Sequence, residues 1–219
     1  MNFAITVFPG SNCDHDAYYV LKNIGFNVDF IWHKTRNLNK YDGILIPGGF
    51  SYGDYLRTGA IAKFSPIMKS VVEQANKGKI IIGICNGFQI LIEAGLLPGA
   101  LITNENTRFI SKKVFLKIKT QKSIFTSNIS KGTILKMPIA HKQGNYIANK
   151  QTIDQLKKND QIIFTYCDNP NGSQQNIAGI TNKNRNVLGM MPHPERASDS
   201  ILGSNDGRLI FESILEEYK

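Results

Sequence analysis

One cysteine of the chain stands in a setting that favours nucleophilic chemistry. Cys85 lies in the run Gly83-Ile84-Cys85-Asn86-Gly87, between a continuous apolar segment and a stretch of helical character. The run matches the G-x-nucleophile-x-G elbow, with cysteine in place of serine. The glycines are needed because this strand-to-helix turn is sharp and crowded. A thiol there faces the positive end of the following helix, which favours the thiolate that attacks carbonyl carbons.

A structural interpretation of Cys85 is also available, since most free cysteines are small buried residues. The glycines on both sides favour catalysis over that interpretation. Cys13 and Cys167 lie far from Cys85 in the sequence, and an odd number of widely spaced cysteines suits neither a disulfide framework nor a CxxC metal site. Cys13 is either a neighbour of the site or a packed loop thiol.

A histidine between two prolines supplies a candidate base. His193 lies in Met191-Pro192-His193-Pro194-Glu195, shortly after another apolar run. Proline disfavours the α region in the residue before it, so His193 is expected to be extended. Residues i and i+2 of an extended segment point the same way, so Glu195 can orient the His193 ring. An HxE pair is also half of many metal sites, but no other ligand cluster accompanies this one, and we predict no metal.

A glycine turn supplies candidate oxyanion donors. Pro47-Gly48-Gly49 follows an apolar run directly, and such a turn exposes backbone N–H groups. The Gly49 N–H and the Asn86 N–H together are the predicted oxyanion hole. Gln89 lies one helical turn after Cys85, where its amide can reach a bound substrate, although the position also suits an ordinary helix residue.

These side chains need a scaffold, and the apolar pattern predicts one. Strand-like runs, rich in β-branched and aromatic residues, recur along the chain. They cover residues 3–8, 28–33, 43–48, 79–84, 114–119, 134–140, 162–166, 177–182 and 186–191. Helical patterns are predicted over 14–24, 65–77, 86–97 and 206–218.

Alternating strands and helices predict an α/β fold with a doubly wound, mostly parallel sheet and helices on both faces. The run at 79–84 is apolar on both faces, as a central parallel strand requires. Residues 114–140 are predicted to form an antiparallel extension. The length of 219 residues suits a single domain over 1–219.

Composition narrows the class of protein. Hydrophobic residues make up 42% and charged residues 20% of the chain, which is typical of a globular protein. The N-terminus has no signal-peptide pattern and no run is long enough to span a membrane, so we expect a cytoplasmic protein. The net charge of +9 raises the question of nucleic-acid binding, but the lysines are dispersed and no nucleic-acid motif is present. A lysine-rich solvated surface is the preferred explanation.

The order and separation of PGG (47–49), GICNGFQ (83–89) and HPE (193–195) resemble the class I, triad-type glutamine amidotransferases. Further segments resemble the family of glutaminase subunits of phosphoribosylformylglycinamidine synthase, which serves de novo purine biosynthesis. They are FPGSNCD (8–14), GGFSYGDYLRTG (48–59), DNPNGS (168–173) and MMPHPERA (190–197), together with PIAH and GNY within 138–146. Lys142-Gln143 departs from the Gly-Glu that the family commonly has there.

The resemblance implies a flavodoxin-like fold and a set of roles. Cys85 is then the nucleophile, His193 the acid and base, and Glu195 the group that orients it. Gly49 and Asn86 provide the oxyanion donors. Gln89 and the 50–57 loop, including Phe50 and Arg57, lie around the glutamine.

The resemblance also implies partners. The sequence contains no GxxxxGK[ST] phosphate loop, so this chain is expected to hold no cofactor. ATP, magnesium and formylglycinamide ribonucleotide are expected on a large synthase subunit, often accompanied by a small accessory subunit. The chain would hydrolyse L-glutamine through a cysteinyl thioester and pass ammonia to that partner.

Three alternatives remain at the level of sequence. A stand-alone cysteine amidase or γ-glutamyl hydrolase of the same fold is the nearest, and the distinctive 48–59 segment argues against it. A binding-only module is disfavoured because Cys85, His193 and Glu195 are all present. A nucleic-acid binder rests only on the net charge and is the weakest.

Overall fold

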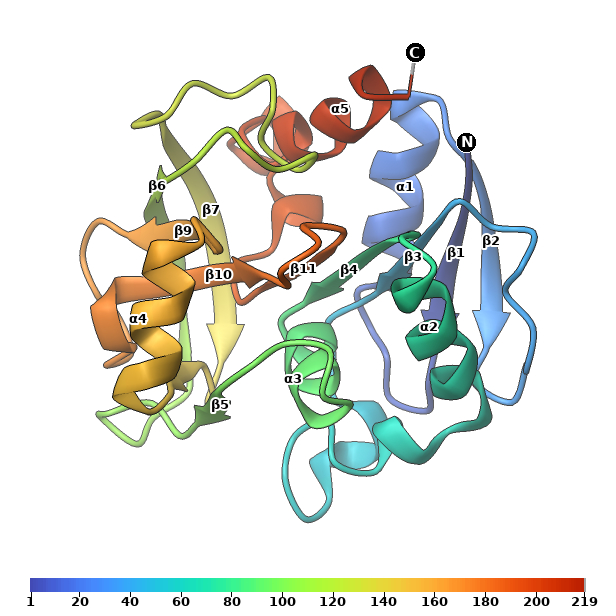
Figure 1. Ribbon diagram of the computed structural model, residues 1–219, viewed down its shortest axis with the longest axis horizontal. Helices are drawn as coiled ribbons and strands as arrows, with labels where there is room; N and C mark the ends of the chain where they lie inside the picture. The colour runs from blue at the N-terminus through green and yellow to red at the C-terminus, as the bar shows by residue number, and fades with distance from the viewer. Residues whose placement is uncertain (219) are drawn as a thin grey trace.

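A nine-stranded sheet runs through the computed structural model, which describes residues 1–218 (Figure 1). The strand order is β2-β1-β3-β4-β11-β10-β9-β6-β7. The strands are β1 (Asn2–Val7), β2 (Asn27–Trp32), β3 (Gly43–Ile46), β4 (Ile80–Ile84), β6 (Ile110–Ile118), β7 (Ile134–His141), β9 (Ile162–Tyr166), β10 (Ile177–Thr181) and β11 (Val187–Met190). β5 (Ala100–Ile102) and β8 (Asn145–Ile147) form a separate antiparallel pair.

The strand pairing changes from parallel to antiparallel at β11. β2, β1, β3, β4 and β11 pair in parallel, whereas β10, β9, β6 and β7 continue the sheet with antiparallel pairings. The predicted doubly wound architecture is therefore confirmed. The antiparallel extension includes β9 and β10 in addition to the predicted segment 114–140.

Five α-helices accompany the sheet in the described chain: α1 (Asp14–Ile24), α2 (Pro66–Asn76), α3 (Asn86–Glu93), α4 (Lys150–Lys158) and α5 (Arg208–Glu216). α1 connects β1 to β2 and α2 connects β3 to β4, moving in opposite directions along the sheet. Right-handed crossovers then place α1 and α2 on opposite faces. α5 packs beside α1, and α3 packs on β4 and β11 (Figure 1).

The central strands are buried as their composition requires. All five residues of β4 and all four of β3 are buried, because helices cover the parallel half of the sheet on both faces. Among residues 1–218, no helix has both the length and the apolar character needed to cross a bilayer.

Some elements differ from the sequence prediction. The helix expected over 86–97 ends at Glu93, where Gly95 adopts a positive φ of 75° and the chain reverses. α4 was not predicted because only Ile153 and Leu156 are buried in it, and its start is fixed by the Asn149 side chain, which accepts from the Thr152 N–H at 2.8 Å.

Short 3₁₀ turns complete the connections. They are η1 (Ser51–Asp54), η2 (Ala62–Phe64), η3 (Gln174–Asn176), η4 (Pro194–Arg196) and η5 (Ser200–Leu202). η1 and η4 lie in the loops that follow β3 and β11. Because β3, β4 and β11 run parallel, these loops and the start of α3 meet at one edge of the sheet.

Candidate active site

Cys85 occupies a strained turn between β4 and α3. Its backbone has φ 51° and ψ −104°, a conformation that residues with a side chain rarely adopt. The turn is anchored by the Cys85 N–H, which donates to the Met190 carbonyl of β11 at 2.8 Å. Strain of this kind costs about 1–3 kcal/mol and persists where the surroundings enforce it, typically at functional sites.

Glycine at position 87 is required by a close approach of backbone. A Cβ on Gly87 would lie 2.0 Å from the Ile46 carbonyl oxygen, and one on Gly83 would lie 2.7 Å from the Gly87 carbonyl group. α3 therefore packs directly on the ends of β3 and β4. The glycines of the predicted elbow act through this packing.

Gly87→Ala is expected to destabilise the fold strongly. Overpacking against backbone costs about 3 kcal/mol, which lowers the midpoint of thermal unfolding by roughly 6–12 °C for a chain of this size. Gly132→Ala is the matched control, because a Cβ there meets nothing within 4 Å and only its positive φ of 94° is strained. The control should lose about 1 kcal/mol. If Gly87→Ala and Gly132→Ala lose the same amount of stability, the close contact with the Ile46 carbonyl is relieved without cost.

His193 and Glu195 form a buried, hydrogen-bonded pair. His193 Nδ1 lies 2.6 Å from Glu195 Oε1, and the two side chains are 2% and 0% exposed. His193 is extended, as predicted, with φ −101° and ψ 90°. Glu195, however, lies in the η4 turn, so the pair meets through a tight turn and not along an extended segment.

The surroundings of His193 favour the protonated form of its imidazole. Burial by itself disfavours protonation of His193, but the negative charges of Glu195 and the Cys85 thiolate, with contacts from Cys13 and Cys85, raise its pKa well above the usual value. Burial, helped by the charge of His193, lowers the pKa of nearby His141 to about 4. His193 is therefore the histidine of this site that can carry a proton near neutral pH.

Two backbone N–H groups adjoin Cys85. Ser11 and Gly49 form an isolated bridge, in which the Asn12 N–H donates to Gly48 O and the Phe50 N–H donates to Gly10 O. This pairing leaves the Gly49 N–H out. The Asn86 N–H belongs to the first turn of α3, where backbone donors have no intrahelical acceptor. Both groups are thus available as oxyanion donors.

A cavity of about 270 Å³ opens beside Cys85. It is lined by Gly49, Phe50, Asp54, Thr58, Cys85, Gln89, Phe109, Ala140, His141, Lys142 and Gln143. Phe50 and Gln89 were predicted to lie near a substrate, and the structure places both on this wall. Burial raises the pKa of the Asp54 carboxyl to about 6.

The Asn86 side chain, which carried no role in the sequence prediction, joins the walls of the cavity. Its Oδ1 accepts from the Ser51 hydroxyl at 2.6 Å. Its Nδ2 donates to Gln89 Oε1 at 2.9 Å and to Asp54 Oδ1 at 3.3 Å. Gln89 Nε2 in turn donates to the Gln143 carbonyl at 2.6 Å. The 50–54 loop, α3 and the loop after β7 are thereby fixed together.

Arg57 lies outside this cavity. Its guanidinium binds Glu93 at the end of α3 through two bonds, Nε to Oε1 at 2.7 Å and Nη2 to Oε2 at 2.6 Å. In the loop before it, Tyr52, Asp54 and Leu56 adopt positive φ values without being glycine. The bidentate pair therefore secures the far end of a strained loop.

Cys13 lies beside His193 and Glu195. The sequence had left open whether this thiol is a neighbour of the site or a packed loop residue. The thiol is buried, and its Sγ, a ring nitrogen of His193 and a carboxylate oxygen of Glu195 all lie within 4.8 Å of one another. The loop that precedes α1 is held there because the Cys13 N–H donates to Gly48 O at 3.4 Å. Of the two open interpretations, the site neighbour is the one observed.

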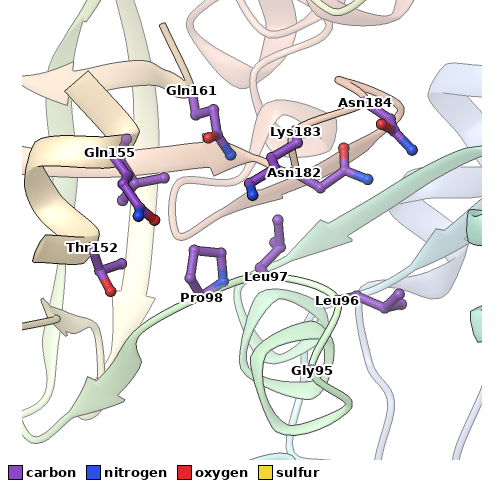
Figure 2. Close-up of a pocket in the computed structure, with 11 residues that line it drawn as sticks. Gly95, Leu96, Leu97, Pro98, Thr152, Gln155, Gln161, Asn182, Lys183 and Asn184 are labelled. Carbon is purple, nitrogen blue, oxygen red and sulfur yellow. The ribbon is translucent and has the colours of Figure 1, made fainter. Parts of the chain in front are cut away.

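A larger cavity lies elsewhere in the described residues. Figure 2 shows this space of about 590 Å³, between the end of α3, the helix α4 and the turn that joins β10 to β11. Leu97 and Pro98 face Gln155 and Gln161 across it, and Lys183 contributes from the turn. None of the predicted site residues lines it.

Comparison with known proteins connects this geometry to a family. Residues 1–208 match the CobB/CobQ-like glutamine amidotransferase domain. The structure described as PurLQS from Thermotoga maritima contains a chain that is 43% identical, with a TM-score of 0.93, over 100% of this chain and 99% of that one.

Two more distant structures share the fold. A Thermoplasma acidophilum protein described as a putative GMP synthase subunit is 17% identical with a TM-score of 0.67, over 100% of this chain and 96% of that one. A glutamine amidotransferase from Thermotoga maritima is 17% identical with a TM-score of 0.59, over 99% of this chain and 91% of that one.

Proposed function

The chain belongs to the CobB/CobQ-like glutamine amidotransferase family, and from this premise we propose that it is the glutaminase subunit of phosphoribosylformylglycinamidine synthase. The observation that carries the proposal is the buried 2.6 Å contact of His193 with Glu195 beside the strained Cys85 elbow. The full-length likeness to the Thermotoga maritima PurLQS chain, at 43% identity, supports this subunit over other amidotransferases of the fold.

The proposed reaction hydrolyses L-glutamine to glutamate and ammonia. The Cys85 thiolate adds to the side-chain amide carbon, and the Gly49 and Asn86 N–H groups hold the oxyanion. His193, oriented by Glu195, gives its proton to the departing ammonia, which leaves a glutamyl thioester on Cys85. His193 then takes a proton from water as the water attacks, and glutamate is released.

Recognition of glutamine is proposed to use both ends of the 270 Å³ cavity. Gln89 and Phe50 contact the side chain and backbone of the substrate. Asp54 and Lys142 carry opposite charges on the cavity wall, which matches the ammonium and carboxylate groups of an amino acid. Arg57 contributes by holding the loop through Glu93.

Asp54→Asn is expected to raise the KM for glutamine by about 10-fold or more with little change in kcat, because a hydrogen bond to a charged group contributes about 1.5–3 kcal/mol. The measurement compares glutamine with 4-carbamoylbutanoate, which lacks the α-ammonium group. Wild type should prefer glutamine strongly, and the variant should lose most of that preference.

Asp29→Asn is the matched control for Asp54, since Asp29 lies on β2 and pairs with Lys40, away from the cavity. The wild-type KM should also rise as the pH falls through about 6, where the Asp54 carboxylate gains a proton and loses its attraction for ammonium. Unchanged discrimination between the two amides in Asp54→Asn would remove Asp54 from recognition.

The ammonia is proposed to pass to a large synthase subunit, with a small accessory subunit in the same complex. ATP and magnesium would bind that partner. The direct test reconstitutes the wild-type chain with the synthase and measures glutamate released from glutamine together with formylglycinamidine ribonucleotide formed. Matched amounts of the two products are expected. Absence of glutamate release by the complete complex would refute the proposal.

A further inference from the structure

The Asn86 side chain is buried within the site, but the proposed reaction uses only the backbone N–H of this residue. Asn86 is 2% exposed and is the first residue of α3, directly after Cys85. Its Oδ1 accepts twice from Ser51, and its Nδ2 donates to Asp54 and to Gln89. Every hydrogen-bonding group of the amide is therefore engaged by a residue at the cavity or next to it.

The orientation of the Asn86 amide is determined by a backbone donor. The Ser51 N–H lies 3.2 Å from Oδ1 and can only donate, so the atom that it meets must be the oxygen. The amide nitrogen is thereby directed to the Asp54 carboxylate at 3.3 Å and to Gln89 Oε1 at 2.9 Å. Gln89 is oriented in the same sense, because its Nε2 donates to the Gln143 carbonyl at 2.6 Å. One backbone group thus fixes the direction of all these bonds.

The loop that carries Asp54 is not held in place by backbone preference. Tyr52 and Asp54 have positive φ values of 56° and 55°, which residues with a side chain rarely adopt. Outside the cavity, the Tyr52 hydroxyl lies 2.8 Å from His33 Nδ1 and 2.7 Å from Ser65 Oγ. At the cavity, the Asn86 amide binds the Asp54 carboxylate. The position of Asp54 therefore depends on these side-chain bonds.

The bond from Asn86 also affects the charge of Asp54. Burial raises the pKa of the Asp54 carboxyl to about 6, and the hydrogen bond from Asn86 acts in the opposite direction. The other ionisable side chains that line the cavity are Cys85, His141 and Lys142. Burial lowers the pKa of His141 to about 4, which leaves that ring uncharged near neutral pH. The amide donor of Asn86 therefore favours an ionised Asp54 at neutral pH.

We infer that the side chain of Asn86 is a positioning group for the recognition of glutamine. It holds the Asp54 carboxylate at the cavity wall and orients the Gln89 amide, while the backbone N–H of the same residue serves the oxyanion. Asn86 thus links the binding of the substrate's ammonium group to the stabilisation of the transition state. This inference rests on the proposed function, and in particular on the role of Asp54 in it.

The test measures how the preference for glutamine over 4-carbamoylbutanoate depends on pH, with ammonia release by the reconstituted complex as the readout. The preference is a ratio of two kcat/KM values, so the ionisation of Cys85 and His193, which both amides require, cancels from it. In wild type the ratio should fall as the pH drops through about 6. In Asn86→Leu, which has a similar shape and no donor, the midpoint should rise by about one pH unit. The KM for glutamine should change more than kcat, since the backbone N–H of residue 86 remains.

Ser51→Ala is the matched control, because it removes a 2.6 Å bond to the other end of the same amide and keeps the donor to Asp54. The Ser51 N–H still fixes the amide orientation, so the midpoint should stay at about 6. Asn86→Ala is a second variant with the same expected rise, and the unfolding midpoint of each variant shows whether it has folded.

A midpoint that stays at about 6 in both Asn86 variants overturns the inference. A wild-type preference that does not change with pH overturns it as well. Neither result affects the release of glutamate by the wild-type complex. Failure of this inference is therefore distinguishable from failure of the proposed function.

Discussion

Cys85→Ala is expected to abolish glutamine-dependent synthesis by the reconstituted complex while ammonia-dependent synthesis continues. Without the thiol no glutamyl thioester forms, and removal of a covalent nucleophile reduces turnover by at least about 10⁴-fold. Added ammonium salt bypasses the missing step because the partner uses ammonia directly. The rate of formylglycinamidine ribonucleotide formation with each nitrogen source is the measurement.

The control for this prediction is Cys167→Ala, which removes an exposed thiol on the antiparallel side of the sheet. It should retain wild-type rates with both nitrogen sources. Loss of ammonia-dependent synthesis with Cys85→Ala would contradict the prediction, because the partner is expected to use ammonia directly. Retention of glutamine-dependent synthesis by that variant would exclude Cys85 as the nucleophile.

Glu195→Gln is expected to cost about 10⁴ in kcat while leaving the fold intact. An amide in place of a carboxylate that orients a catalytic histidine stabilises the wrong tautomer of the ring, and losses of this size are known for such exchanges. The negative charge of Glu195 also helps to raise the pKa of His193, so its removal weakens the imidazolium that must donate to ammonia. Burst release of ammonia and steady-state release of glutamate report the two half-reactions.

Glu212→Gln serves as the control for charge removal, since Glu212 pairs with Arg208 on the surface of α5. Its kcat should stay within a factor of two or so, because exposed ion pairs contribute about 0–1 kcal/mol. The unfolding midpoint of Glu195→Gln should also be measured. A kcat for Glu195→Gln close to that of the control would show that His193 keeps its orientation unaided.

The parts of the site that are local in sequence could be predicted. The elbow at Cys85 follows from the glycines on either side of it. The prolines on either side of His193 predicted its extended backbone, although Glu195 meets it through the η4 turn. Buried runs such as β4 were equally clear because their composition is apolar throughout. In each case a few neighbouring residues determine the conformation.

Features that depend on contacts between distant segments could not be predicted from the sequence. Cys13 reaches His193 only because β11 pairs with β4 in the middle of the sheet, which brings the loop after β11 to the loop after β1. Arg57 turns to Glu93 because α3 ends where the 50–57 loop passes. The pairing of β5 with β8 is short and half-exposed, so its residues give too weak an alternation to be recognised.

The pairing of β4 with β11 has a consequence for the order in which the site is made. β2, β1, β3, β4 and the elbow come from the first part of the chain, whereas His193 follows the last strand, which joins the sheet at its centre. Contacts between segments so far apart form late, because closing a long loop carries an entropic cost before the contact stabilises it. During synthesis Cys85 therefore emerges before Met190, which anchors its turn, and before His193, its proposed base. On the proposed mechanism, the thiol stays catalytically silent until the C-terminal part has folded, so only complete molecules release ammonia.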